Sequence, residues 1–358
     1  MTLPSSGQIS LGDVANEFGY TDGSQTKLGS YRTTNGQGNY PLSVGSLSYS
    51  SIDGGGAVPV GSAQIKLSDF RNTQLQTVVN FYGSGKGGNR LNAYNRYSSN
   101  SSGDVTVVGN YRSRPTNTSG TRVKIHVNQT IGSEKNSINH CALRTGNAWN
   151  AGTTLSVDVG SSGRVQGSGG DGGDGSVNNG SGQPGGSGSS GLGVEYTETA
   201  VNIVSGGIIA AGFGGGGGGA GGEQTDKPGT RYAAGGGGGG GAGIPVGVGG
   251  EKGQRTSGLS AGSSNSGPGT NASTSGGGGA GTAGDGGAGG NNANEAGGSA
   301  GGEGGQNGEA ADAGGNNDGT GGAAGGDGSA IRRTSGSIVV DINDGSRVLP
   351  NAVAEGVA

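Results

Sequence analysis

The chain has 358 residues, a formal net charge of −4 and 93 glycines, whereas only 28% of its residues are hydrophobic and 4% aromatic. This length has room for about two or three domains, and the weakly acidic charge argues against nucleic acid as a partner, because that would require clustered Lys and Arg. A single cysteine, Cys141, excludes an intrachain disulfide framework.

The first segment, residues 1–75, contains a short internal repeat. Gln8–Val14 recurs as Gln64–Phe70, and Lys27–Arg32 is a partial third copy. The first copy has the Ser-x-x-Asp spacing of a helix start, so we expect short helical turns. Such small units dock on one another or on a partner chain, and the alternative is a self-contained small domain. We predict that a virion-facing attachment surface uses the apolar positions of the repeat: Leu11, Val14, Leu28, Tyr31, Leu67 and Phe70.

Residues 76–165 read as a β-rich domain. Runs with period-two alternation or β-branched residues are bounded by Gly, Asn, Ser and Pro. The predicted strands are Gln76–Tyr82, Asp104–Val108, Thr121–Val127 and Thr154–Val159. This pattern predicts an antiparallel sheet or sandwich. We expect Trp149, the only tryptophan, to pack at the rim of this domain rather than to stack on a ligand.

Most of the glycines lie in residues 166–330, in runs such as Gly214–Gly219, Gly235–Gly241 and Gly276–Gly279. This composition is typical of disorder, of collagen, or of segments that pack backbone against backbone. Collagen is excluded because glycine does not recur strictly at every third position. Extended threefold helices without Cβ atoms can approach closely and bond laterally, which pairs their backbone groups. We therefore predict a sandwich of polyglycine II helices, which strand-like segments at both ends join to the β domain. Residues 331–358 form a final strand and tail.

Any binding specificity of such a sandwich must lie in its connections, because the glycine segments carry almost no side chains. The connections are visible as breaks in glycine density, and they include Arg and Tyr, which dominate binding hot spots. The alternative is that these breaks are solubilising turns. The candidate receptor-binding residues are Asp226, Lys227, Arg231, Tyr232, Lys252, Arg255, Asn291 and Asn317.

The sequence contains no convincing catalytic, cofactor or metal motif. The only histidines are His126, in an alternating strand, and His140, whose neighbour Cys141 would point to the opposite face of a strand. Asp171 and Asp174 resemble one turn of a calcium-binding repeat. However, Ser176 stands where a large apolar residue is needed, and no second copy follows. We expect no enzyme activity, no cofactor and no metal, and a solvated acidic loop at the two aspartates.

Two parts of the chain resemble known phage proteins. Leu3–Val14, followed by Leu28–Arg32 and Lys66–Arg71, resembles the N-terminus of tail-associated structural proteins of tailed bacteriophages, cyanophages among them. Val204–Gly214 and the exit through Ala330–Gly336 are similar to the glycine-rich adhesins at the tips of T-even-type long tail fibres. This second resemblance implies a polyglycine II sandwich whose distal loops meet a host surface protein or glycan, while another part caps the trimeric fibre.

The combined expectation is a virion tail or tail-fibre protein that acts as a receptor-binding adhesin. Its partners would be other tail or fibre proteins at the N-terminal module and a host surface protein or glycan, with no nucleic acid; a homo-oligomer is compatible with it. The main alternative is a purely structural fibre, collar or baseplate component. A bacterial surface protein or an ice-binding slab is a third class, which the start of the chain without a signal peptide, the lack of disulfides and the irregular glycine spacing argue against.

Overall fold

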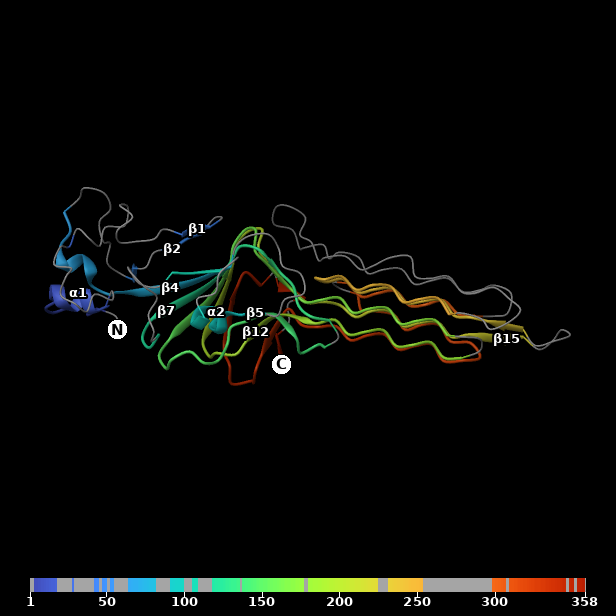
Figure 1. Cartoon of the computed structure of the whole chain (residues 1–358). Helices are drawn as coiled ribbons and strands as arrows, with labels where there is room; N and C mark the ends of the chain where they lie inside the picture. Colours follow the sequence, from blue (N-terminus) through green and yellow to red (C-terminus); the bar gives the residue numbers. More distant parts are fainter. Residues whose placement is uncertain are drawn as a thin grey trace.

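The computed structural model describes residues 3–17, 28, 42–44, 47–49, 52–54, 64–81, 91–99, 105–108, 118–135, 137–176, 180–224, 231–253, 298–306, 309–345, 348–350 and 353–357. These residues are mainly β, with the short helices α1 (Leu11–Glu17) and α2 (Ala93–Ser99) and the 3-10 turn η2 (Leu67–Phe70). The molecule is elongated, with α1 at one end, the large sheets in the middle and β15 (Gly222–Gln224) at the other end (Figure 1). None of the helices described is both long and apolar enough to cross a membrane.

Three sheets make up the middle of the molecule. Sheet 1 contains β3 (Ile52–Gly54), β4 (Thr73–Phe81), β6 (Val105–Val108), β7 (Arg122–Val127), β10 (Thr154–Val159), β13 (Thr199–Ile203) and β18 (Val340–Asn343). Sheet 2 contains β8 (Thr130–Ile131), β11 (Arg164–Gln166), β14 (Ile208–Ala210) and β19 (Val348–Leu349). Sheet 3 contains β5 (Leu91–Asn92), β9 (Cys141–Arg144), β12 (Ser190–Val194), β17 (Ile331–Arg333) and β20 (Val353–Glu355). Two hairpins stand apart, β1 (Leu42–Val44) with β2 (Leu47–Tyr49), and β15 with β16 (Arg231–Ala233).

The chain passes through the three sheets in a fixed order, and each circuit lies on the one before. The circuits are β7-β8-β9, β10-β11-β12, β13-β14-β17 and β18-β19-β20, and the strands of successive circuits pair in parallel. The middle of the molecule is thus a parallel β-solenoid. The four predicted strands are present, but the prediction of an antiparallel domain is wrong for β4, β7 and β10, which pair in parallel. Only the predicted strand β6 pairs antiparallel, with β4. The alternation of apolar and polar residues shows which face of a strand is buried. Whether two strands pair in parallel or antiparallel depends on how the chain connects them, and here it completes a whole circuit before it returns to the same sheet.

Apolar side chains from equivalent positions of successive circuits fill the solenoid. Ile125 lies opposite Val157, which lies opposite Val201, and these three side chains are fully buried. Since the side-chain period of a strand is two, the residues between them form rows on the outer face. One outer row runs Asn80, His126, Asp158, Asn202 and Asn343.

The glycine-rich segments are two excursions from one corner of the solenoid. The first, residues 167–189, leaves after β11 and returns at β12; the second, residues 211–330, leaves after β14 and returns at β17. Both pass from sheet 2 to sheet 3, in consecutive circuits. The glycine-rich region is therefore interrupted, because residues 190–210 belong to the solenoid.

The described residues of both excursions run out and back as extended legs, which together form what we call the slab (Figure 1). We number the legs in chain order: leg 1 (167–176), leg 2 (180–189), leg 3 (211–221), leg 4 (234–244), leg 5 (245–253), leg 6 (298–306), leg 7 (309–315) and leg 8 (320–330). Backbone bonds show that odd-numbered legs run parallel to leg 3 and even-numbered legs antiparallel to it.

Backbone hydrogen bonds between legs repeat every third residue. Gly170, Gly173 and Ser176 of leg 1 donate to the carbonyls of Phe213, Gly216 and Gly219 of leg 3. The N–H groups of leg 3 donate in rotation to legs 2, 4 and 7, and its carbonyls accept from legs 1, 6 and 8. Leg 3 is therefore enclosed on all sides by other legs. This accounts for buried backbone groups that no side chain could pair.

The slab needs glycine for space rather than for an unusual backbone conformation. A Cβ on Gly215 would lie 2.1 Å from the carbonyl oxygen of Asp171, and one on Gly217 would lie 1.9 Å from that of Gly322. The described glycines with positive φ all lie outside the legs. The runs Gly214–Gly219 and Gly235–Gly241 fall in legs 3 and 4, which are buried, because contact on every side leaves no direction for a side chain.

Candidate functional site: the distal tip of the slab

The slab ends, far from the solenoid, in a small hairpin. Leg 3 continues into β15, and leg 4 begins at the end of β16. In this antiparallel pair Glu223 lies opposite Tyr232, and Gln224 opposite Arg231. Arg231 and Tyr232 thus lie on a strand at the far end of the molecule (Figure 1).

A second distal element is the turn between legs 7 and 8. Asn316, Asn317 and Asp318 are exposed. The Asn316 Oδ1 accepts a bond from the Gly321 N–H at 2.7 Å, and the Asp318 Oδ2 accepts one from the Glu223 N–H at 2.5 Å. The turn is therefore bonded to leg 8 and to β15.

Lys252 lies at the distal end of leg 5. The next residue, Gly253, donates to the Gly235 carbonyl at 3.0 Å, close to the end of β16, and the preceding Glu251 N–H donates to Asp174 Oδ1 at 2.7 Å. The side chain of Lys252 is exposed. Leg 5 therefore adds a cation beside the hairpin.

The predicted loop residues divide into two groups. The structure brings Arg231, Tyr232, Lys252 and Asn317 to one end of the slab. The other four, Asp226, Lys227, Arg255 and Asn291, lie outside the described residues. Glycine breaks did not distinguish distal connections from proximal ones. Gln306 and Glu309 also interrupt the glycines, but their backbones bond to each other where legs 6 and 7 meet, near the start of leg 3. A connection is distal or proximal according to whether the leg before it runs away from the solenoid or back toward it, and the sequence does not show this.

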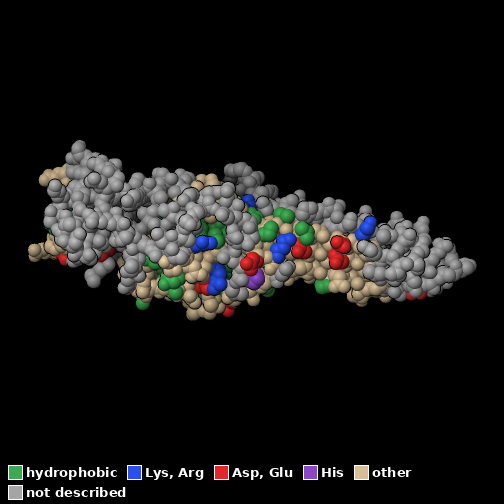
Figure 2. Space-filling model, viewed as in Figure 1, with side chains coloured by type: hydrophobic (Ala, Val, Ile, Leu, Met, Phe, Trp, Pro, Cys, Tyr) green, Lys and Arg blue, Asp and Glu red, His purple; other side chains and the backbone are tan. Residues whose placement is uncertain are grey.

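The two aspartates that resemble a calcium repeat bind backbone groups instead. Asp171 Oδ1 accepts from the Val248 N–H at 2.8 Å and from Lys135 Nζ at 2.6 Å, and Asp174 bonds Glu251 as described. Among the described residues, these two carboxylates are thus the acceptors for the Val248 and Glu251 N–H groups of leg 5. Charged side chains of both signs lie along the visible face of the molecule (Figure 2). Over the described part of the chain, no group of three or more His, Cys, Asp or Glu side chains could hold a metal ion.

At the opposite end, the N-terminal repeat folds as two matching turns. Ser10 N–H donates to Asp13 Oδ2 at 2.8 Å at the start of α1, and Lys66 N–H donates to Asp69 Oδ2 at 2.7 Å at the start of η2. The expected helical turns are confirmed in these two copies, since both cap their own first turn. The third copy, residues 27–32, lies outside the described residues apart from Leu28.

The predicted attachment residues mostly face one another in a small core. Val14 and Phe70 are fully buried in a cluster with Leu3, Ile9, Ala15 and Ile65. Leu28 and Leu67 pack against this cluster and, like Leu11, stay half-buried. Tyr31 lies outside the described residues. The side chains that retain accessible surface for a partner are thus the three leucines.

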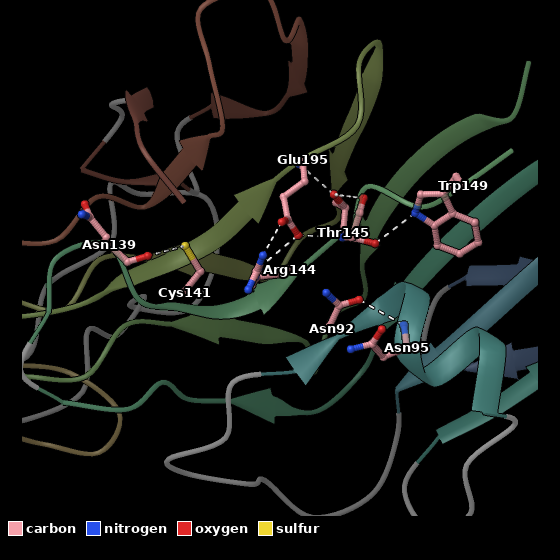
Figure 3. Close-up of polar contacts among 9 residues, drawn as sticks. Asn92, Asn95, Asn139, Cys141, Arg144, Thr145, Trp149 and Glu195 are labelled. Carbon is pink, nitrogen blue, oxygen red and sulfur yellow. Dashed lines mark hydrogen bonds and ion pairs between the residues drawn. The ribbon is translucent and has the colours of Figure 1, made fainter. Parts of the chain in front are cut away.

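A polar cluster in the solenoid, partly buried, has no sequence motif that marks it. Arg144 pairs with Glu195, whose carboxylate also accepts from the Gly146 N–H at 3.0 Å (Figure 3). The Thr145 carbonyl accepts a hydrogen bond from Trp149 Nε1 at 3.0 Å. The Trp149 ring lies edge-on to the Tyr94 ring, with 5.1 Å between the ring centroids. The indole is buried in the solenoid core. The cluster ties β9 to the end of β12, a structural role.

Comparisons with known proteins give a remote likeness. No protein-family model matches the chain, and no curated protein matches it. A solved structure that does match is the crystal structure of the gp37-gp38 adhesin tip complex of the bacteriophage S16 long tail fibre. It shares 18% identity at a TM-score of 0.34, over 84% of this chain and 90% of that one.

Proposed function

We propose that this chain is a virion tail or tail-fibre protein that binds a host surface protein or glycan through the distal end of its glycine slab. The observation that carries the proposal is that Arg231, Tyr232, Lys252 and Asn317 all lie at the same end of the slab, the end where β15 lies, opposite α1. Arg and Tyr are the residue types that dominate binding hot spots. The role is binding rather than catalysis.

We further propose that the legs are polyglycine II helices. The three-residue repeat of the lateral bonds supports this, because such a helix has three residues per turn and directs its backbone groups outward. At ~3.1 Å per residue, leg 3 would hold the tip ~30 Å from the solenoid. In this role the slab is a stiff arm, and the half-buried leucines of the N-terminal module meet another tail or fibre protein.

The test is a replacement of Glu223–Tyr232 by a short glycine linker, and separately an exchange of Glu251–Ser275 for a neutral loop of equal length. We expect both variants to lose adsorption of the particle to its bacterial host. The matched control replaces Gln306 and Glu309, which lie at the proximal end of the same slab, by glycine, and should adsorb normally.

The alternative, a purely structural fibre, collar or baseplate component, predicts a different result. Changes at the tip would then leave adsorption and host range intact, whereas removal of the chain would prevent assembly of the particle. Normal adsorption by both tip variants would refute the receptor-binding proposal.

A further inference from the structure

The hairpin at the tip has an edge that no third strand covers among the described residues. In an antiparallel pair, successive N–H groups alternate between pointing at the partner strand and pointing away from it. The Glu223 N–H donates to Asp318 Oδ2, so it points away from β16. The Asp318 carboxylate thus occupies the place that a carbonyl of a third strand would take.

Asp318 can act in this way because its turn is bonded to legs 8 and 3 as well as to the hairpin. The turn is bonded to leg 8 through Asn316 and Gly321, and the Gly319 N–H donates to the Gly221 carbonyl at 3.4 Å. Residues 223 and 318 are 95 positions apart in the sequence. A carboxylate that accepts from a backbone N–H makes a charge-assisted bond, stronger than a bond between neutral groups.

We propose that Asp318 is the positioning residue of the tip. Its carboxylate fixes the edge of the hairpin to the turn at 316–319, and this sets the strand that carries Arg231 and Tyr232 relative to Asn317. Asp318 acts through the hairpin rather than by touching a receptor. The effect of Asp318 on receptor binding rests on the proposed function. The coupling between the turn at 316–319 and the hairpin does not.

The test compares three variants of the full chain. Asp318→Ala removes the acceptor, Asp318→Asn keeps a neutral acceptor of the same shape, and Asp312→Ala is the matched control. Asp312 is an exposed aspartate of leg 7 whose backbone groups carry its bonds to legs 3 and 6. The first readout is amide hydrogen exchange at Glu223. We expect exchange at least about tenfold faster in Asp318→Ala, near the original rate in Asp318→Asn, and no change in Asp312→Ala.

The second readout is binding of the purified, fluorescently labelled protein to whole bacterial cells, with the strain chosen by a screen of the unmodified protein. We expect Asp318→Ala to bind at least about fivefold more weakly at an unchanged melting temperature, with binding largely restored in Asp318→Asn. Unchanged exchange at Glu223 in Asp318→Ala would overturn the coupling, whatever the receptor. Faster exchange with full binding would overturn the positioning role. If the unmodified protein binds no cells, the proposed function fails, and the exchange experiment still decides the coupling.

Discussion

At the scale of single residues, glycine in this chain acts by lacking a Cβ atom. The positions in leg 3 are closed by backbone atoms of neighbouring legs, which cannot move aside as a flexible side chain can. Glycines at the surface of the same slab differ, because a Cβ on Gly326 would meet only Ser187 Oγ at 3.9 Å. Glycines of the same slab therefore differ greatly in whether they can be replaced by a larger residue.

Gly217→Ala tests this difference. The added carbon would lie 1.9 Å from the Gly322 carbonyl oxygen, so legs 3 and 8 must separate. We expect a loss of at least ~3 kcal/mol in the free energy of unfolding. Gly326→Ala is the matched control and should change stability by less than about 1 kcal/mol. Urea denaturation measures both, and equal effects would contradict the role assigned to close packing.

His126 gives the chain a pH-dependent stability. Its side chain belongs to the outer row of sheet 1 but is nevertheless fully buried. This burial lowers its pKa from 6.5 to about 4, although the nearby carboxylate of Asp158 opposes the shift. The unfolded chain therefore takes up a proton near pH 6.5, whereas the folded chain takes it up only near pH 4. The stability from this residue is complete above pH 6.5 and is lost progressively between pH 6.5 and 4, by about 3 kcal/mol.

His126→Gln should flatten that part of the pH profile, measured as the free energy of unfolding in urea from pH 4 to 7.5. His140→Gln is the control, because His140 is half-buried beside Glu134 outside the strands, and it should leave the slope intact. A slope that survives His126→Gln would assign the pH dependence to other groups.

At the scale of elements, side chains complete bonds that the legs leave open. Asp327 Oδ1 accepts from the Gly214 N–H at 2.7 Å, where the other N–H groups of that row, on Gly217 and Ala220, donate to carbonyls of leg 7. Asp171 and Asp174 do the same for leg 5. The carboxylates thus stand in for absent backbone acceptors at the edges of the slab.

Asp171→Ala should therefore loosen leg 5 without unfolding the solenoid. It removes the acceptor for the Val248 N–H and the partner of Lys135, and we expect the stability of leg 5 to fall by about 1–3 kcal/mol. We expect faster amide exchange at Val248 and unchanged exchange in β10. Lys135→Met separates the two contributions, because it removes only the ion pair; if it reproduces the whole effect, the bond to the backbone is unimportant.

At the scale of the whole molecule, the solenoid and the slab differ in what holds them together. The solenoid has an apolar core that includes Val157 and Trp149, whereas the slab depends on backbone bonds between legs far apart in the sequence. Legs 1 and 2, which come from the other excursion, flank leg 3 on two of its sides and supply hydrogen-bond partners for its backbone. The second excursion therefore cannot complete its packing without the first.

Replacement of residues 167–189 by a short loop tests this dependence. We expect the solenoid to persist, reported by the fluorescence of Trp149, and amide protection to be lost in legs 3 and 4, reported by exchange at Gly235–Gly241. A slab that keeps its protection without legs 1 and 2 would contradict the interlocked arrangement.

The sequence alone determined the local properties of the chain. The alternation of Arg122–Val127 gave a strand, the spacing of Ser10 and Asp13 gave a helix start, and glycine runs marked segments that can hold no side-chain core. These follow from the backbone and from nearest neighbours.

Only the tertiary structure decided the direction of strand pairing, the single corner from which both excursions leave, and which glycine breaks lie at the tip. Those features depend on contacts between residues many positions apart, such as Glu223 with Asp318. Glycine offers no side chain to specify its neighbours, so the register of the legs is set by the solenoid that anchors them and by the few carboxylates along their edges.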